Sequence, residues 1–305
     1  MAARIGIVGS ANMDLVVRAA CIPLAGENVL GDEFLTIPGG KGANQAVAAA
    51  RLGADAVFIG RVGDDTFGER LLTGLNEDGV DTSCVKVVPN TASGIAMIVV
   101  APNGQHTIVI CPNANRMLLP QDIRALQDVI GELDALLMQL EIPPETVVET
   151  VRICRGLGVP VILDAGPPRD ALPPEAMRVT ILSPNEDEAG KLVKRKIQNA
   201  TDAELAGREL LDRGAQSVVL KLGRRGAVVV TPDGCVRVPA CNITPVDTTA
   251  AGDAFTAALG VFTAEGMELA EAVRMANRAG AIAATRLGAQ TSLPTRAEVE
   301  AFEGN

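Results

Sequence analysis

Helix-like and strand-like segments alternate regularly in this chain from Pro120 onward. Short runs of Val, Ile and Leu, which read as strands, lie at residues 135–139, 161–164, 179–182 and 217–220. Segments with apolar residues at helical spacing lie before or between them, at residues 121–130, 145–157 and 203–213, with a further helix from Asn185. Strands that are apolar on both sides are typical of a parallel sheet with helices on both faces. The pattern predicts an α/β fold with a mainly parallel central sheet.

Two early regions, at about residues 12–37 and 93–112, do not fit this sheet. Both contain extended segments interrupted by turn residues, and Asn103-Gly104 lies between two apolar runs. An Asn-Gly pair tolerates the positive φ of a tight turn and therefore indicates a β-hairpin. We expect the two regions to form a small antiparallel sheet that serves as a lid. No linker rich in Pro, Gly or Ser divides the chain, so residues 1–305 are predicted to form one domain that carries the lid.

The charge and the aromatic content argue against several classes of function. The 305 residues include 27 Lys and Arg against 37 Asp and Glu, a formal net charge of −10. This negative charge disfavours nucleic acid and anionic membranes as partners. Tyr and Trp are absent, so stacking platforms for nucleic-acid bases are not expected. His106 is the only histidine, which argues against a histidine-rich metal site and against a hydrolase with a histidine base.

The six cysteines are scattered along the chain and form no C-x-x-C pair. A chain of this length and apolar content does not need disulfides for stability. No apolar run approaches the ~18 residues of a membrane span, and the first residues read as a strand and not as a signal peptide. We therefore expect a cytoplasmic protein with reduced thiols.

A run of small residues and aspartates, D-T-T-A-A-G-D at residues 247–253, comes directly before an apolar helical segment. The first N–H groups of a helix have no acceptor within the helix, and the helix dipole is positive at that end. The small residues Ala250, Ala251 and Gly252 would let an anion approach these N–H groups. Asp253 could accept a proton from an attacking hydroxyl, so the run suits phosphoryl transfer to an alcohol. The alternative is a simple N-cap aspartate after a turn.

A second stretch, P-G-G-K-G-A-N-Q-A at residues 38–46, also leads from an extended segment into a helix. It lacks the G-x-x-x-x-G-K-[ST] spacing of a P-loop. Together the two stretches resemble the paired signatures of the ribokinase-like (PfkB) carbohydrate kinases, and the resemblance extends from residues 9–14 to residues 288–292. It implies a ribokinase-like fold whose lid closes over a sugar and pairs the subunits of a homodimer. It also implies a sugar kinase that uses ATP, Mg²⁺ and K⁺.

Within this family the two stretches are most similar to members that phosphorylate the 5-hydroxyl of D-ribose. The resemblance implies that Asp253 is the base and that residues 250–253 form the anion hole. Deoxyribose, fructose, a ketodeoxy acid and a nucleoside remain alternative acceptors. Asn12 and Asp14 offer partners for several ribose hydroxyls, which favours ribose, and six Phe without Tyr or Trp disfavour a purine sandwich.

Two further classes are disfavoured. A nucleotide-linked oxidoreductase needs G-x-G-x-x-G after the first strand, and G-I-V-G-S at residues 6–10 lacks this spacing. A non-catalytic relative should have lost the base, whereas Lys41 and Asp253 are both present.

The expected sugar contacts follow predicted strands, where α/β sheets place their ligand sites. Asn12 and Asp14 come after the first strand, and Glu141 comes after the apolar run at 136–140. Each of these alone could be a cap or a loop residue. The family resemblance implies that the sugar is contacted by Asn12, Asp14, Gly40, Lys41, Asn44, Glu141 and Asp253.

The expected nucleotide contacts lie in the second half of the chain. The resemblance implies that Asn185 and Glu188 form an N-x-x-E motif for Mg²⁺ and phosphate, although acidic residues here could simply cap a helix. It also places ATP along the loop with Lys221, Gly223 and Gly226, which could instead be a solvated turn. The full set that it implies for ATP is Asn185, Glu188, Lys221, Gly223, Gly226, Gly252 and Asn277. Lys221 stands where other members carry Thr, and D-A-G-P-P at 164–168 departs from the commoner N-P-A-P or D-P-A-P.

The resemblance further implies a K⁺ site beside the anion hole. Its ligands would be the Asp247 carboxylate, the Ser292 hydroxyl, and carbonyls of Thr249, Ala283, Arg286 and Gly288. Ala250 replaces the first Gly of the family's D-T-x-G-A-G-D. Alanine at this position still exposes its N–H, provided that its φ stays negative.

Overall fold

An eight-stranded sheet forms the centre of the computed structural model, which describes residues 2–303. The strand order is β14-β13-β12-β11-β10-β9-β1-β4. Neighbours from β12 to β4 run parallel, whereas β12, β13 and β14 pair antiparallel at one edge. The strands are β1 (Arg4–Val8), β4 (Asp55–Ile59), β9 (Ala135–Met138), β10 (Val161–Asp164), β11 (Ile181–Ser183), β12 (Ser217–Lys221), β13 (Ala227–Thr231) and β14 (Gly234–Val238). The predicted mainly parallel α/β sheet is confirmed.

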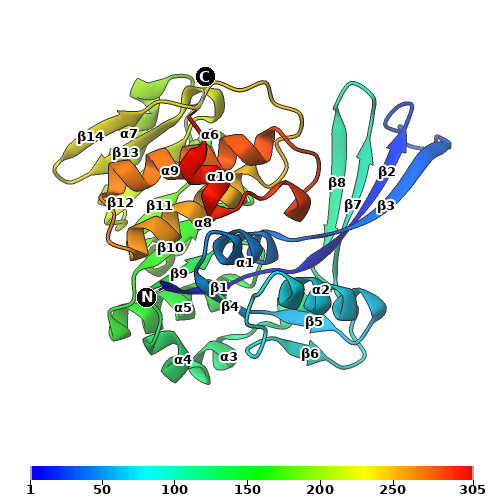
Figure 1. Cartoon of the computed structure of the whole chain (residues 1–305), viewed down its shortest axis with the longest axis horizontal. Coiled ribbons are helices and arrows are strands. Elements are labelled where there is room, and N and C mark those ends of the chain that lie inside the picture. The colour runs from blue at the N-terminus through cyan, green and yellow to red at the C-terminus, as the bar shows by residue number, and fades with distance from the viewer. Residues whose placement is uncertain (1, 304–305) are drawn as a thin grey trace.

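Helices cover both faces of this sheet (Figure 1). Alternate strand residues point to opposite faces, so Ile7 joins one apolar core and Val8 the other. The first core is completed by α1 (Lys41–Arg51), α2 (Thr66–Glu77), α8 (Ala251–Ala264), α9 (Leu269–Ala284) and α10 (Arg296–Ala301). The second is completed by α3 (Pro120–Arg124), α4 (Gln127–Gly131), α5 (Pro144–Leu157), α6 (Glu186–Leu192) and α7 (Ala200–Asp212). The predicted helix at 121–130 is thus two short helices, α3 and α4.

A four-stranded sheet with the order β3-β2-β7-β8 projects from the main body as a lid (Figure 1). Its strands are β2 (Asn12–Ala19), β3 (Gly31–Gly39), β7 (Gly94–Val100) and β8 (His106–Cys111). The expected Asn103-Gly104 turn joins β7 to β8, which pair antiparallel. The two lid regions lie close to the predicted 12–37 and 93–112.

The prediction of a purely antiparallel lid is wrong, because the central pair β2 and β7 runs parallel. The two strands leave the main body in the same direction, and a parallel pair needs a long crossover connection. That connection runs back along β3 and then through the segment between Gly39 and Gly94, which contains α1, α2 and a two-stranded sheet of β5 (Arg61–Gly63) and β6 (Lys86–Val88).

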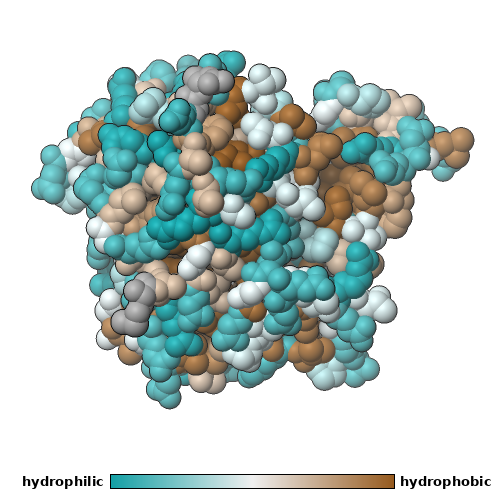
Figure 2. All heavy atoms as spheres, viewed as in Figure 1, coloured by the Kyte–Doolittle hydropathy of each residue, from teal (hydrophilic) through white to brown (hydrophobic). Residues whose placement is uncertain are grey.

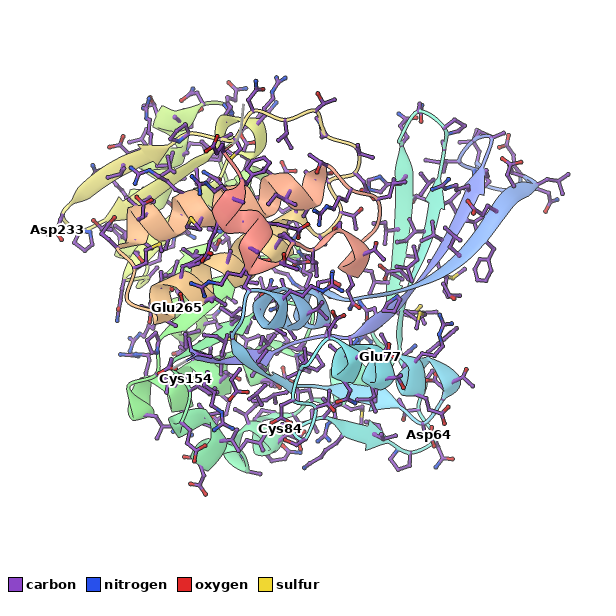
Figure 3. All side chains as sticks on the ribbon, in the orientation of Figure 1. Asp64, Glu77, Cys84, Cys154, Asp233 and Glu265 are labelled. Carbon is purple, nitrogen blue, oxygen red and sulfur yellow. The ribbon has the colours of Figure 1, made fainter. Side chains whose placement is uncertain are left out.

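All six cysteines are free thiols, as expected. Figure 3 labels two of them, Cys84 in the turn before β6 and Cys154 on α5. Burial raises the pKa of the Cys154 thiol to about 12, which keeps it protonated. Among residues 2–303, no helix has both the length and the apolar content that crossing a bilayer requires. Residues 1, 304 and 305 of the predicted single domain lie outside the described part.

Candidate active site

Polar side chains from several strands gather at the carboxyl end of the central sheet, beneath the lid. Asp164 ends β10, Lys221 ends β12, and Glu141 follows β9. Asn12 and Asp14 lie at the start of β2, where the chain passes from the central sheet to the lid. In parallel α/β sheets, this edge is the usual position of a ligand site.

Asp253 lies in the first turn of α8 and is 4% exposed. Asn44 Nδ2 donates to Asp253 Oδ2 over 2.9 Å, and Lys41 Nζ lies 3.7 Å from Asp253 Oδ1. Both partners come from the first turns of α1, which packs against α8. The two conspicuous stretches of the sequence therefore meet at one carboxylate.

The N-terminus of α8 leaves backbone donors free next to Asp253. The Ala251 N–H is bonded to Thr248 O over 3.3 Å. Within the described residues, the N–H groups of Ala250, Gly252 and Asp253 have no acceptor. Together with the helix dipole, these donors can bind an anion. Of the four N–H groups of residues 250–253, three are thus free donors, and that of Ala251 is used within the loop.

Ala250 adopts the left-handed conformation, with φ of 58° and ψ of 2°. The condition of a negative φ is therefore not met, although the Ala250 N–H is still free. The turn that aims the free N–H groups of α8 outward requires a left-handed residue at the N-cap, the position where the family's Gly would stand. An alanine in this conformation carries about 1–2 kcal/mol of strain.

At the start of β2, where the resemblance implies sugar contacts, Asn12 is 3% exposed, and its Oδ1 accepts from Asn115 Nδ2 over 2.8 Å. Asn115 also accepts from the Ala11 N–H over 3.0 Å, so it fixes the orientation of the Asn12 amide. Asn115 was not identified from the sequence, since it lies in a segment without regular pattern. Gly40 has φ of 89°, and a Cβ at this residue would lie 2.6 Å from the backbone nitrogen of Asn12.

Asp14 and Glu141 lie beside this amide pair. Burial, followed by the charges of Glu141 and Asp253, raises the pKa of Asp14 to about 7. Glu141 Oε2 accepts from Ser10 Oγ over 2.5 Å and from the Lys41 N–H over 3.3 Å. Ser10 is a further residue that the sequence analysis did not assign.

Asn44 completes this side of the site. It is 5% exposed, and in the described part of the chain its Oδ1 has no hydrogen-bond partner although its Nδ2 holds Asp253. A buried acceptor without a donor is costly. A bound hydroxyl group would satisfy it.

Two lysines meet at Asp164, which is 1% exposed. Lys221 Nζ lies 2.7 Å from Asp164 Oδ1, and Lys41 Nζ lies 3.8 Å from Asp164 Oδ2. Burial alone would raise the pKa of Asp164, but the charges of Lys221 and Lys41 outweigh it and lower the pKa. Burial alone would lower the pKa of Lys41, but the negative charges of Asp253 and Asp164 outweigh it and raise the pKa. Asp164 and Lys41 are therefore both ionised at neutral pH.

The Asn185–Glu188 motif forms a capping box at the start of α6. Asn185 Oδ1 accepts from the Glu188 N–H over 2.9 Å, and Glu188 Oε2 accepts from the Asn185 N–H over 2.7 Å. The simple capping interpretation is therefore correct for these atoms. Glu188 also faces the site: a Cβ on Gly166 would lie 2.7 Å from its Oε1 and 2.9 Å from Lys41 Cε. Burial and the charge of Asp164 raise the pKa of Glu188.

The glycine loop after β12 lies on the same edge of the sheet. Gly223 and Gly226 have φ of 54° and 83°, and a Cβ on Gly226 would lie 2.1 Å from Val238 O. Asn277, on α9, donates through Nδ2 to Pro239 O over 3.0 Å. Asn277 thus ties α9 to the segment that follows β14.

The expected cation site is organised around Asp247. Its Oδ1 accepts from the Thr249 N–H over 2.9 Å, and its Oδ2 accepts from the Gly288 N–H over 3.0 Å. Burial raises the pKa of Asp247, but these hydrogen bonds outweigh it and lower the pKa. The Ala283 carbonyl accepts from the Arg286 N–H, and Ser292 Oγ donates to Ala289 O. Asp247, Thr249 and Gly288 are thus brought together.

Free N–H groups at the start of α8 lie beside the buried carboxylate of Asp253, an arrangement suited to an enzyme that transfers an anionic group. The family model for "pfkB family carbohydrate kinase" matches residues 2–296. The chain therefore belongs to the PfkB family of carbohydrate kinases, and it is a sugar kinase, a phosphotransferase.

Individual relatives cover almost the whole chain. A ribokinase of Bacillus subtilis is 41% identical over 294 residues, covering 96% of this chain and 97% of the relative. A deoxyribokinase of Salmonella typhimurium is 32% identical and covers 95% of each chain. A solved structure of Arabidopsis thaliana ribokinase complexed with ribose and ATP has a TM-score of 0.91, 32% identity and 98% coverage of both chains.

Proposed function

We propose that this protein transfers the γ-phosphoryl group of ATP to the 5-hydroxyl of D-ribose. The similarity to ribokinases, one of them bound to ribose and ATP, supports this acceptor and this donor. The observation that carries the proposal is the position of Asp253. It lies in the first turn of α8, beside free N–H groups, and it is held by the α1 residues that border the sugar side.

In this mechanism, Asp253 accepts the proton of the sugar hydroxyl as the oxygen attacks the γ-phosphorus. The free N–H groups of Ala250, Gly252 and Asp253 stabilise the charge on the transferred group. Lys41 Nζ lies 3.7 Å from Asp253 Oδ1. Its positive charge can therefore stabilise the negative charge that passes from the carboxylate to the attacking oxygen. General-base help is typically worth about 10²–10⁴ in rate.

The sugar side offers several acceptors and donors for hydroxyls. Asn12, Asp14 and Glu141 supply oxygens, and Asn44 supplies a buried Oδ1 that lacks a partner within the described residues. A 2-deoxy sugar would leave one such group unpaired, at about 1–3 kcal/mol if it is buried. The similarity to a deoxyribokinase keeps 2-deoxyribose as the alternative acceptor.

The charge balance of the phosphate side favours Mg²⁺ together with ATP. Three carboxylates, Asp164, Glu188 and Asp253, share this side with two lysines, Lys41 and Lys221. In the described part of the chain, no three His, Cys, Asp or Glu side chains could hold a metal by themselves. Mg²⁺ typically keeps water and shares substrate phosphates, so Glu188 would hold it through water while it neutralises phosphate charge.

We also infer a K⁺ ion next to the anion hole, held by Asp247 and neighbouring carbonyls. The lowered pKa of Asp247 supports a permanent negative charge at this position. Rates in KCl should exceed those in tetramethylammonium chloride at equal ionic strength. Equal rates in the two salts would remove K⁺ from the proposal.

A cytoplasmic homodimer formed through the lid completes the proposal. Apolar side chains gather over the lid strands (Figure 2), and Phe34, Met97 and Val109 are 61%, 54% and 58% exposed. Patches of this kind commonly mark a protein interface, and a second lid would also cover the open strand edges. Sedimentation equilibrium should give a dimer, and a monomer at micromolar concentration would contradict it.

Product analysis tests the proposed reaction. The protein should convert MgATP and D-ribose to ADP and a phosphorylated pentose whose phosphorus couples to the C5 protons in ³¹P NMR. Coupling to another position would overturn the assignment of the 5-hydroxyl.

A further inference from the structure

Gln45 is a buried residue that the proposed mechanism does not use. It follows Asn44 on α1 and is 0% exposed. Its Nε2 lies 3.3 Å from Asp253 Oδ1 and 3.2 Å from Asp164 Oδ2. One amide group therefore donates one hydrogen to each of two buried carboxylates.

The orientation of this amide is fixed by a second buried glutamine. Gln139, directly after β9, donates through Nε2 to Gln45 Oε1 over 2.6 Å and is also 0% exposed. Because Gln45 Oε1 is occupied in this way, its NH₂ group must face the carboxylates. Gln139 Oε1 packs closely against Gly9, where a Cβ would lie 2.2 Å from it.

The same carboxylates connect Gln45 to the nucleotide side. Asp164 binds Gln45 through Oδ2 and Lys221 through Oδ1. Lys221 is the first residue of the glycine loop that is proposed to lie along ATP. A continuous row of contacts thus joins Lys221, Asp164, Gln45 and Asp253.

We propose that Gln45 is a positioning residue for phosphoryl transfer, which fixes the Asp253 carboxylate relative to the Lys221–Asp164 pair. This inference rests on the proposed role of Asp253 as the base. Asn44 holds one oxygen of Asp253, and Gln45 holds the other. Two donors from consecutive residues of one helix prevent the carboxylate from rotating, so the oxygen that receives the proton stays aimed at the acceptor. Misplacing a reacting group by about 1 Å can cost about 10²-fold in rate.

Gln45→Met tests this role, because methionine keeps nearly the same volume and removes both donors. We expect kcat to fall about 10- to 100-fold, the usual consequence of losing a hydrogen bond to a charged group. The KM values for sugar and ATP should change less than about 3-fold, because Gln45 is fully buried and is not among the proposed substrate contacts. Each kcat is calculated per molecule of protein that binds ADP. Misfolded protein, which does not bind ADP, then does not lower the measured kcat.

The decisive comparison repeats the change in an Asp253→Asn background. If Gln45 acts through the base, Gln45→Met should cost little there, so the two effects should be strongly non-additive. Equal losses in both backgrounds would overturn the proposal and leave Gln45 a structural residue. Near-normal turnover of Asp253→Asn itself would instead overturn the proposed role of Asp253 as the base.

Two further variants protect the test against a folding defect. Thr150→Val removes another buried hydrogen bond, from Thr150 Oγ1 to Thr146 O on α5, away from the site, and should leave kcat unchanged. Gln139→Met touches neither carboxylate and only releases the Gln45 amide. It should lower kcat about 3- to 10-fold when Asp253 is present and have no effect in the Asp253→Asn background. An unchanged kcat in Gln139→Met at full ADP binding would contradict the proposed orientation.

Discussion

Asn44 and Asp253 are joined by a hydrogen bond of 2.9 Å between Nδ2 and Oδ2, although 209 positions separate them in the chain. The amide that we propose to border the sugar therefore also holds the carboxylate that we propose as the base. This contact unites in one site the two signature stretches, each of which leads into a helix. In the proposed mechanism, substrate binding and chemistry therefore share the Asn44 side chain.

Replacing Asp253 by asparagine should abolish most turnover. The two side chains have nearly the same shape, so the fold and ADP binding should be kept, while kcat falls by about 10²–10⁴ through loss of the base. Steady-state kinetics and a thermal melt measure the two effects. Asp233→Asn, at the exposed β13–β14 turn (Figure 3), is the matched control. A kcat near that of the control would rule out Asp253 as the base.

The Asp14 carboxyl should make the stability of the sugar-free protein depend on pH. Its pKa is about 7 when folded, against 3.8 for an ordinary aspartate, so the folded protein keeps the proton longer. The stabilisation by this group is complete below about pH 4 and is lost as the pH rises to about 7. A shift of this size corresponds to at most about 4 kcal/mol.

Asp14→Asn should remove this dependence. Urea unfolding from pH 4.5 to pH 8 should show the variant gaining free energy of unfolding relative to wild type as the pH rises. The sugar KM should be higher in the variant, because an amide replaces an acceptor. Parallel stability curves for the two proteins would contradict the raised pKa.

Replacing one member of the Lys221–Asp164 ion pair should destabilise the protein, whereas replacing both members together should cost much less stability. Lys221→Thr alone leaves Asp164 buried without its nearest cation, and breaking a buried pair in this way costs about 3–5 kcal/mol. Asp164→Asn with Lys221→Thr replaces both charged side chains by neutral ones. The double variant should recover most of the loss in urea unfolding. A double variant as unstable as the sum of the single variants would contradict the pairing.

Ala250→Gly should stabilise the protein. Alanine is strained at φ of 58°, by about 1–2 kcal/mol, whereas glycine adopts this conformation freely but loses more entropy on folding. The net gain in the free energy of unfolding should be about 0.5–1 kcal/mol. Asn90→Gly, at φ of 53°, is the control, because asparagine tolerates this conformation and should gain less. Equal gains at both positions would contradict strain at Ala250.

Local patterns predicted the elements that position the site. The helices that begin at Lys41 and Ala251 were expected, because small residues and an apolar period mark their starts. The strands of the central sheet were expected because short apolar runs alternate with helical segments. The parallel direction of the β2–β7 pair was not predicted. It depends on how the 54 positions between Gly39 and Gly94 fold and return the chain to the lid.

Residues that act only through other residues were not predicted. Gln45 lies within the signature stretch, but its partners Asp164 and Asp253 are 119 and 208 positions away. Asn115 is a polar residue in an irregular segment, and only the folded chain brings it to Asn12. The positive φ of Ala250 was missed because the sequence offers an alanine where the loop geometry favours glycine.

The most direct test of the proposed function compares acceptors in a coupled ADP-release assay with MgATP and K⁺. D-Ribose, 2-deoxy-D-ribose, D-fructose and adenosine are supplied at equal concentration. The site described above predicts that ribose gives the highest kcat/KM, by about tenfold or more over 2-deoxyribose, since a missing hydroxyl leaves a buried partner unpaired. A higher kcat/KM for any other acceptor would contradict ribose as the substrate.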